Sequence, residues 1–238
     1  TMPFFAMAAC AVVTTLIVLL TVPVVEQDGQ RGATAVSPRE HFRELWQTAV
    51  LQRSVLLVAG SGQVLMQLVR VSRSVLIPLV AANQLGLDVA DVGLVMSIGS
   101  ALDTLMFLPA GFVMDRLGRK RAIVPSIVLQ GIGFLLLPLT TGFGTITAVA
   151  GLIGFANGFS SGTMMTLGAD LAPPDRRVSF LALWRLFSAT GFALWPLLVG
   201  FVAQAFALGV ASLAVGVVGL TAGLVFGRYV PETLSNDD

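Results

Sequence analysis

Seven long apolar runs constrain the fold of this chain more than any other feature. Each is near or above the roughly 20 residues that a helix needs to cross the hydrocarbon core of a bilayer, and few charged residues interrupt them. The pattern shows neither the polar faces of a soluble bundle nor the short alternating segments of a barrel. The sequence therefore predicts an all-α polytopic membrane protein. The runs cover residues 3–25, 54–82, 90–114, 122–140, 146–169, 178–203 and 205–227.

The composition excludes several other classes of protein. Hydrophobic residues make up 55% of the 238 residues and charged residues only 11%, so the charges are too few to cover a soluble surface of this size. The sequence contains no cluster with metal-ligand spacing, no nucleophile elbow and no phosphate-binding loop. We therefore expect no enzyme activity, no cofactor and no nucleic-acid partner. The expected partner is the lipid bilayer.

The Lys and Arg residues indicate the orientation in the membrane. They concentrate in alternate connections between the runs, whereas the other connections hold none. Because cytoplasmic loops carry the excess of positive charge, the odd-numbered connections and the carboxyl terminus are predicted to be cytoplasmic, in a plasma or inner cell membrane. These cations are Arg31, Arg39, Arg43, Arg53, Arg116, Arg119, Lys120, Arg121, Arg176, Arg177 and Arg228.

The first connection is the only long one. Phe42, Leu45, Trp46 and Val50 recur in it at helical spacing, which predicts an amphipathic helix at the cytoplasmic membrane surface. A mobile tether with a short helical turn is the alternative. The chain is thus predicted to comprise a first membrane helix, a cytoplasmic loop, a six-helix bundle and a cytoplasmic tail, at residues 1–25, 26–53, 54–228 and 229–238.

Ionisable residues inside the runs are functional candidates because charge is costly at membrane depth. Gln63, Gln67, Arg70 and Ser74 fall at spacings that place them on one helix face, and that face is not expected to contact lipid. We expect these polar groups to line a cavity or gate. The charged candidates inside the runs are Arg70, Arg73, Asp103 and Arg185.

The depths of the charged candidates allow ion pairs between neighbouring helices. At 1.5 Å per residue, Arg70 lies about 24 Å from the start of its run, and Asp103 lies about 20 Å from the start of the next run, which has the opposite direction. An ion pair of Asp103 with Arg70 or with Arg73 is therefore feasible. The alternative for Arg73 is that its side chain extends to the outer interface.

Glycines mark close helix packing in two of the runs. Gly154, Gly158 and Gly162 form two overlapping GxxxG steps, which predicts close helix contact rather than substrate binding. Asn157 and Ser161 lie one turn apart in the same run and are predicted to face a cavity. The last run repeats the spacing without a charged residue and is predicted to be a peripheral packing helix, through Gly219, Gly223 and Gly227.

Polarity divides the six-helix block into two sets of three. The first, second, fourth and fifth runs of the block carry buried polar groups, whereas the third and sixth carry almost none. Three helices followed by a topologically inverted set of three is the arrangement of an inverted-repeat secondary transporter.

The stretch "GFVMDRLGRKRA" lies between the second and third runs of this block. It resembles the signature loop of the major facilitator superfamily, G-x-x-x-D-R-x-G-R-[RK]. The stretch beginning "GADLAPPDRRVSF" and the terminal "GRYVPETL" also resemble that family, although Trp195 and Val199 stand where antiporters of the family often have glycine. The residues that match the signature are Gly111, Asp115, Arg116, Gly118, Arg119 and Lys120.

The resemblance places the chain within a longer transporter. It implies that the chain corresponds to helix six, the central loop and helices seven to twelve, with the amino-terminal half as the partner of this region. The family forms its cavity between two such halves. A truncated product, or a half-molecule that transports nothing without a partner chain, is the alternative from a different functional class.

The signature loop is expected to act as a conformational latch. Gly111 is predicted to permit close helix approach and Gly118 a tight reversal, while Asp115 can accept hydrogen bonds at a helix amino terminus. Arg119 is predicted to meet Asp170 on the same side of the membrane. By resemblance, these contacts hold one conformation and break when the halves move. The alternative is that the loop is only a positive anchor.

The resemblance also implies a function. The predicted activity is secondary-active efflux of a drug or metabolite by alternating access, and protons are the candidate coupling ion. Scattered polar groups and aromatics, rather than a dense sugar-binding set, favour this prediction. The alternative within transport is uptake of a sugar or an organic anion, for which the arginine-bearing helix would supply a countercharge.

Overall fold

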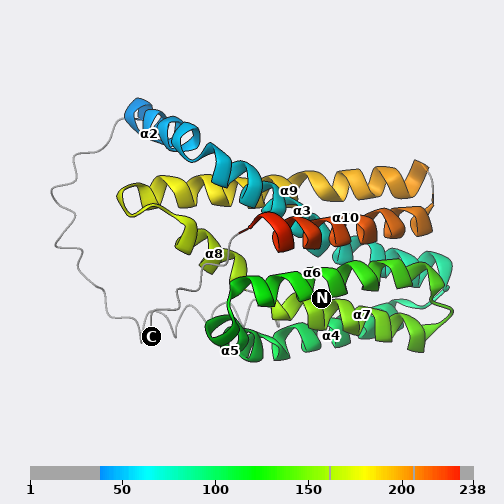
Figure 1. Ribbon diagram of the computed structural model, residues 1–238. Helices are drawn as coiled ribbons and strands as arrows, with labels where there is room; N and C mark the ends of the chain where they lie inside the picture. Colours follow the sequence, from blue (N-terminus) through cyan, green and yellow to red (C-terminus); the bar gives the residue numbers. More distant parts are fainter. Residues whose placement is uncertain (1–37, 161, 206, 231–238) are drawn as a thin grey trace, which may run out of the picture. The chain divides into compact units, whose positions relative to one another are not determined.

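The computed structural model describes residues 38–160, 162–205 and 207–230 (Figure 1). In these ranges all regular structure is helical, as the all-α prediction requires. The elements are α2 Pro38–Leu51, α3 Arg53–Leu79, the π-helical turn η1 Val80–Gln84, α4 Val89–Leu105, α5 Phe107–Leu117, α6 Arg119–Leu136, the 3-10 turn η2 Leu137–Leu139, α7 Phe143–Phe159, α8 Thr163–Leu171, the 3-10 turn η3 Pro174–Arg176, α9 Arg177–Ala205 and α10 Leu208–Tyr229.

Five stretches within the described residues are long and apolar enough to cross a membrane. The helix α9, 29 residues long, covers the fifth predicted segment of the block, residues 178–203. The first predicted membrane helix, residues 3–25, lies outside the described residues. The five stretches are Arg53–Gln84, Val89–Arg116, Arg119–Leu139, Phe143–Leu171 and Leu208–Tyr229.

Local sequence explains where several of these helices begin and bend. The Asp88 side chain accepts a hydrogen bond of 2.7 Å from the Asp91 backbone N–H and so caps the start of α4. Pro78 lies inside α3 and supplies no backbone donor, and the π-helical turn η1 follows directly. There the Leu85 N–H bonds to the carbonyl of Val80, five residues earlier, whereas an α-helix would use the carbonyl one residue closer.

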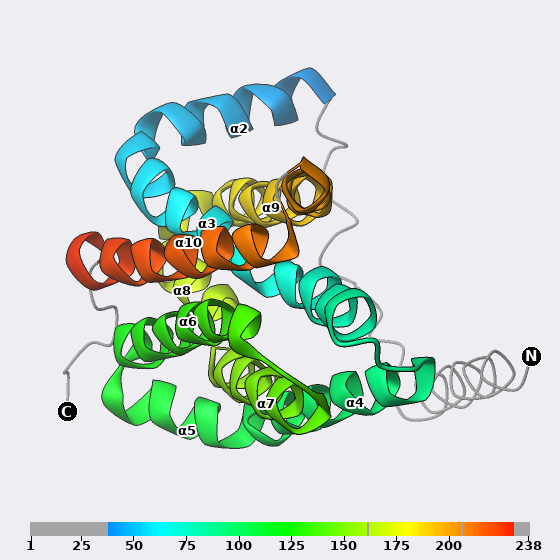
Figure 2. The same cartoon turned by 90° about the vertical axis from the view of Figure 1, so that its right-hand side faces the viewer.

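The spans pack in the order α4, α7, α6, α10, α3 and α9, each mainly against its neighbours in this series. Figure 2 shows α10 between α3 and α6, with α4 and α9 at the two ends. The first three spans of the block can be exchanged for the second three. This exchange matches α3 with α7 and α8, α4 and α5 with α9, and α6 with α10. This exchange turns the packing order into its own reverse, as expected of a three-plus-three inverted repeat.

Individual contacts follow the same exchange. A Cβ on Gly60 of α3 would lie 3.2 Å from the Phe187 ring of α9. The equivalent contact joins α4 to α7, where a Cβ on Gly99 would lie 3.1 Å from the Ala150 carbonyl oxygen. Gly60 leaves room for the Phe187 ring, whereas Gly99 lets the backbones of α4 and α7 approach closely.

Glycine packing is strongest between α4 and α7 and between α6 and α10. A Cβ on Gly154 would run into the carbonyl oxygen of Gly99, and one on Gly158 into that of Asp103. The helix α10 packs on α6 in the same way. It was predicted to be a peripheral helix, but it contacts more of the bundle than a peripheral helix would. The glycines at the α6–α10 contact are Gly131, Gly216, Gly219 and Gly223.

Two of the predicted spans are interrupted rather than continuous. The helices α4 and α5 meet at Met106, and α7 and α8 are separated by residues 160–162. Gly162 adopts φ 82°, a conformation that other residues rarely adopt, and a Cβ there would meet nothing within 4 Å. The predicted packing role of Gly162 is therefore wrong: this glycine ends a helix break.

The third span of the block is more polar inside than the sequence pattern indicated. Ser126 and Gln130 of α6 are fully buried, and the Ser126 hydroxyl donates a hydrogen bond of 2.6 Å to the Ala156 carbonyl of α7. Gln130 in turn donates to the Ser126 oxygen at 3.3 Å. A buried polar pair thus joins α6 to α7, which corrects the prediction that this helix carries almost no polar groups.

Candidate functional site

A cluster of buried charges joins α3, α4 and α7. The Asp103 carboxylate of α4 forms an ion pair of 2.6 Å with the Arg73 guanidinium of α3. Both of its oxygens also accept from the Asn157 side-chain amide of α7 at 3.0 Å. Only 6% of Asp103 is exposed, so this carboxylate depends on these partners for its stabilisation.

Arg70 occupies the other side of Asn157. Its Nη2 donates to the Ser160 hydroxyl at 3.2 Å and makes a longer contact of 3.4 Å with the Asn157 carbonyl oxygen. Both acceptors lie at the carboxyl-terminal end of α7, where the last backbone carbonyls carry partial negative charge. The Arg70 guanidinium therefore caps the helix break, while Asn157 connects it to Asp103.

The sequence alone left the partner of Asp103 open between Arg70 and Arg73. The structure assigns the direct ion pair to Arg73, so this side chain does not merely extend to the outer interface. Asn157, predicted to face a cavity, is instead buried against Asp103. Ser161, the other residue of that pair, lies outside the described residues.

The charged cluster, defined as Arg70, Arg73, Asp103, Asn157 and Ser160, lies at a seam between two apolar clusters of the core. One contains Val69, Leu76, Phe134 and Ile153, and the other contains Met66, Ile127, Met164 and Trp184. Met66 and Val69, about one turn apart on α3, thus belong to different clusters. The charged cluster thus forms a polar layer between the two apolar clusters.

Both helix interruptions adjoin this polar layer. The Met106 N–H is shared between the carbonyls of Leu102 and Asp103, at 3.3 and 3.2 Å. A Cβ on Gly158 would lie 2.8 Å from the Met106 Cβ, so the interruption in one span faces the end of α7 in the other. Interrupted membrane helices release backbone groups that need partners, and in transporters they form binding sites.

The other predicted cavity residues lie apart from the charged cluster. Gln63 is buried and its amide donates to the Ser188 hydroxyl of α9, while Gln67 is half-buried beside Gly191. Ser74 is exposed and bonds to its own helix, at the Val71 carbonyl. Arg185 is exposed on α9, one turn before Ser188. The predicted polar face of α3 therefore contacts α9 at one end and the charged cluster further along.

The interior beside Arg73 holds little empty space. A cavity of about 10 Å³ lies there between α3, α4 and α7, which is enough for about one water molecule. No solute fits on that side in this conformation. The residues that line it are Arg73, Ile77, Val95, Met96, Gly99, Ser100 and Ala150.

The signature loop forms a second site, at the junction of α5 and α6. Gly118 is buried and adopts φ 102°, which allows the reversal between the two helices. Arg119 Nε lies 3.0 Å from Asp170 Oδ2 at the end of α8. The first turn of α6 carries three cations, which its own helix dipole disfavours, so the nearby carboxylate offsets their cost.

Other parts of the loop differ from the predictions. A Cβ on Gly111 would meet nothing within 4 Å, so the described residues show no close helix approach there. Asp115 is exposed on α5, and the adjoining helix α6 begins without a side-chain cap hydrogen bond. The Arg116 guanidinium stacks over the Phe112 ring at 4.0 Å. Gly111 and Asp115 thus lie on the outer surface of this bundle.

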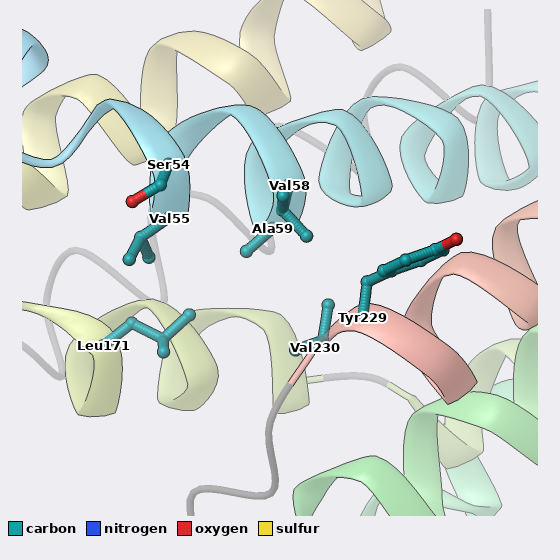
Figure 3. Close-up of a pocket in the computed structure, with 7 residues that line it drawn as sticks. All are labelled: Ser54, Val55, Val58, Ala59, Leu171, Tyr229 and Val230. Atoms are coloured by element: carbon teal, nitrogen blue, oxygen red, sulfur yellow. The ribbon is translucent and has the colours of Figure 1, made fainter.

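A larger cavity of about 200 Å³ lies at the opposite end of α3 from the π-helical turn (Figure 3). Its walls are largely apolar, and its first residue on α3, Ser54, lies about 24 Å along the helix from Arg70. This cavity therefore has neither the polarity nor the position of the charged cluster. Its lining residues are Ser54, Val55, Val58, Ala59, Leu171, Tyr229 and Val230.

Sequence reasoning missed two hydrogen bonds made by tryptophans. The Trp195 indole donates to the Ser72 hydroxyl of α3, and the Trp184 indole donates to the Met164 carbonyl of α8 at 3.0 Å. A tryptophan inside an apolar run signals a donor that needs a partner. Only the packing shows which partner it finds.

Comparisons with known proteins agree with this architecture. The family model described as Major Facilitator Superfamily matches residues 60–237. An uncharacterized MFS-type transporter of Mycobacterium tuberculosis is 32% identical over 141 residues, which are 58% of this chain and 33% of that protein. Inner membrane transport protein YnfM of Escherichia coli is 25% identical over 154 residues, 65% of this chain and 37% of its own length.

A third relative is the hexuronate transporter of Bacillus subtilis, 25% identical over 150 residues, which are 63% of this chain and 36% of that transporter. The chain therefore spans 33% to 37% of the length of these relatives.

Proposed function

Because the chain belongs to the major facilitator superfamily and is a multi-pass membrane protein, we propose that it supplies part of a carrier that moves a small solute by alternating access. It corresponds to helices six to twelve of that carrier, and the amino-terminal half is its partner. The observation that carries the proposal is the charged cluster at the helix interruptions, enclosed by an inverted pair of three-helix repeats.

The Arg119–Asp170 ion pair is the proposed latch of this carrier. It joins the start of α6 to the end of α8, and those helices belong to different repeats. A contact of this kind stabilises one arrangement of the two repeats and is lost in another. Asp115 and Arg116, exposed on the same side, are proposed to contact the amino-terminal half.

For direction and substrate, we favour export of a drug or metabolite across the plasma or inner membrane, driven by a proton gradient, with the carboxyl terminus in the cytoplasm. Scattered polar groups on α3 and α9, such as Gln67 and Arg185, support a site without a dense sugar-binding set. Uptake of a sugar or organic anion is the second candidate. Arg70 and Arg73 favour it, as does the relative that is named a hexuronate transporter.

Inverted membrane vesicles that contain the full-length carrier test this function. We expect fluorescent substrates to accumulate in them when a proton gradient is present and to equilibrate when an uncoupler collapses it. Vesicles from cells that lack the carrier are the control. If flux never exceeds that control, the carrier function is wrong. Accumulation that ignores the gradient excludes proton antiport, and accumulation in right-side-out vesicles favours uptake.

A further inference from the structure

The charged cluster contains one more cation than it has carboxylates to balance. Arg70 and Arg73 bring two guanidinium groups between α3, α4 and α7, whereas Asp103 brings a single carboxylate. That carboxylate is occupied by Arg73 and Asn157. Among the described residues, Arg70 forms no ion pair.

Arg70 also has N–H donors that form no hydrogen bond with the described residues. Its Nη2 group makes both of its hydrogen bonds, to the Asn157 carbonyl and the Ser160 hydroxyl. The Nε–H is buried without a partner in the described part of the chain, and Nη1 bonds to none of these residues either. A guanidinium has five N–H donors and binds carboxylates most strongly when several of them act together.

The helix end beside Arg70 does not remove this excess charge. The carboxyl terminus of a helix carries the equivalent of roughly half a negative charge, so it offsets only part of one guanidinium. The Asn157 carbonyl at this helix end accepts from Nη2 alone. An uncompensated cation at membrane depth is costly, and such groups mark ligand or ion pathways.

The repeat exchange does not supply a second carboxylate. In the second repeat, the contact between α9 and α3 places Gly191 against Gln67. Neither of these two residues carries a carboxylate, so this contact adds no charge that would balance Arg70.

From this geometry we propose that the transported solute carries a carboxylate group, and that Arg70 binds it through the donors left open at Nε and Nη1. The inference rests on the proposed carrier function and adds the chemical class of its substrate. One carboxylate matches the single excess charge of the cluster. A phosphate monoester, with nearly two negative charges at pH 7, would reverse the sign of that charge instead of cancelling it.

Matched acid and amide pairs test this inference on the purified full-length carrier. We would measure the melting temperature and the apparent Kd with lactate, benzoate and D-glucuronate and with their three neutral amides. At least one acid should raise the melting temperature while its amide does not. The variant Arg70→Gln should weaken binding of that acid by about tenfold to a hundredfold, as the loss of a charge-assisted hydrogen bond implies.

Two further variants keep the test interpretable. Arg70→Lys retains the charge but loses the fork of donors, so it should bind the acid with intermediate affinity even if Arg70→Gln fails to fold. Arg228→Gln removes an exposed arginine at the end of α10 and should leave the affinity unchanged. If an amide binds as well as its acid, if no acid binds, or if both Arg70 variants bind normally, the inference is wrong.

The outcome is separable from that of the proposed function. A carrier that moves a neutral fluorescent substrate in vesicles but binds none of the acids retains its transport function and refutes the carboxylate site. A carrier that binds an acid through Arg70 but shows no flux in vesicles retains the site and refutes transport.

Discussion

Arg73 of α3 and Asp103 of α4 form an ion pair of 2.6 Å, and only 9% of the Asp103 side chain is exposed. The pair links the first two spans of the block at a level where apolar clusters lie on both sides. Removal of one partner leaves a charge without compensation in a poorly solvated interior, which costs more than removal of both.

Asp103→Asn should therefore destabilise the full-length carrier by about 3 kcal/mol, and Arg73→Gln by less, because its side chain is the more exposed of the two. The double variant should recover part of the loss, with a coupling energy above about 1 kcal/mol. Thermal unfolding in detergent measures all three, and Asp175→Asn, on a side chain that is 74% exposed, is the control. Strictly additive losses would refute the energetic coupling.

Gly154→Ala should disrupt the α4–α7 contact, because its new Cβ would run into the Gly99 carbonyl oxygen. Overpacking of this kind costs about 1–3 kcal/mol. Gly144→Ala is a matched control in the same helix, since a Cβ there meets nothing within 4 Å and helix propensity favours alanine. Equal melting temperatures for the two variants would contradict the close packing of these helices.

Asp170→Asn and Arg119→Gln should each leave membrane insertion intact and change the transport rate, because the ion pair between them links the two repeats. The reversed pair, Arg119→Asp with Asp170→Arg, should restore part of the rate that each single reversal loses. Asp115→Asn should impair transport as well, through its proposed contact with the other half. Initial rates in vesicles check this. Wild-type rates in all of these variants would leave the loop as a membrane anchor only.

The apolar face of α2 should contact the membrane surface. Phe42, Trp46 and Val50 are exposed along one side of this helix, whereas Thr48 on another side is buried. A spin label at Trp46→Cys should collide more with lipid-soluble oxygen, and a label at Glu44→Cys more with a water-soluble nickel chelate. The same accessibility at both positions would favour a tether exposed to water.

Much of the architecture could be predicted because it depends on local quantities. The apolar runs predicted each described span to within a few residues, and the signature residues around Gly118 predicted the family. The pairing within the charged cluster could not be predicted. Helices that are apolar on nearly every side leave their rotation undefined, so either Arg70 or Arg73 satisfied the depth argument for Asp103.

The sequence by itself determined the class of fold, the approximate limits of the described spans and the family, because hydrophobic length and a short motif are properties of the chain alone. The tertiary structure decided which side chains meet. It paired Asp103 with Arg73, placed Arg70 at the end of α7 and turned Gly162 from a packing residue into a helix break. Those outcomes depend on how two helices are rotated and shifted against each other, and only packing sets these.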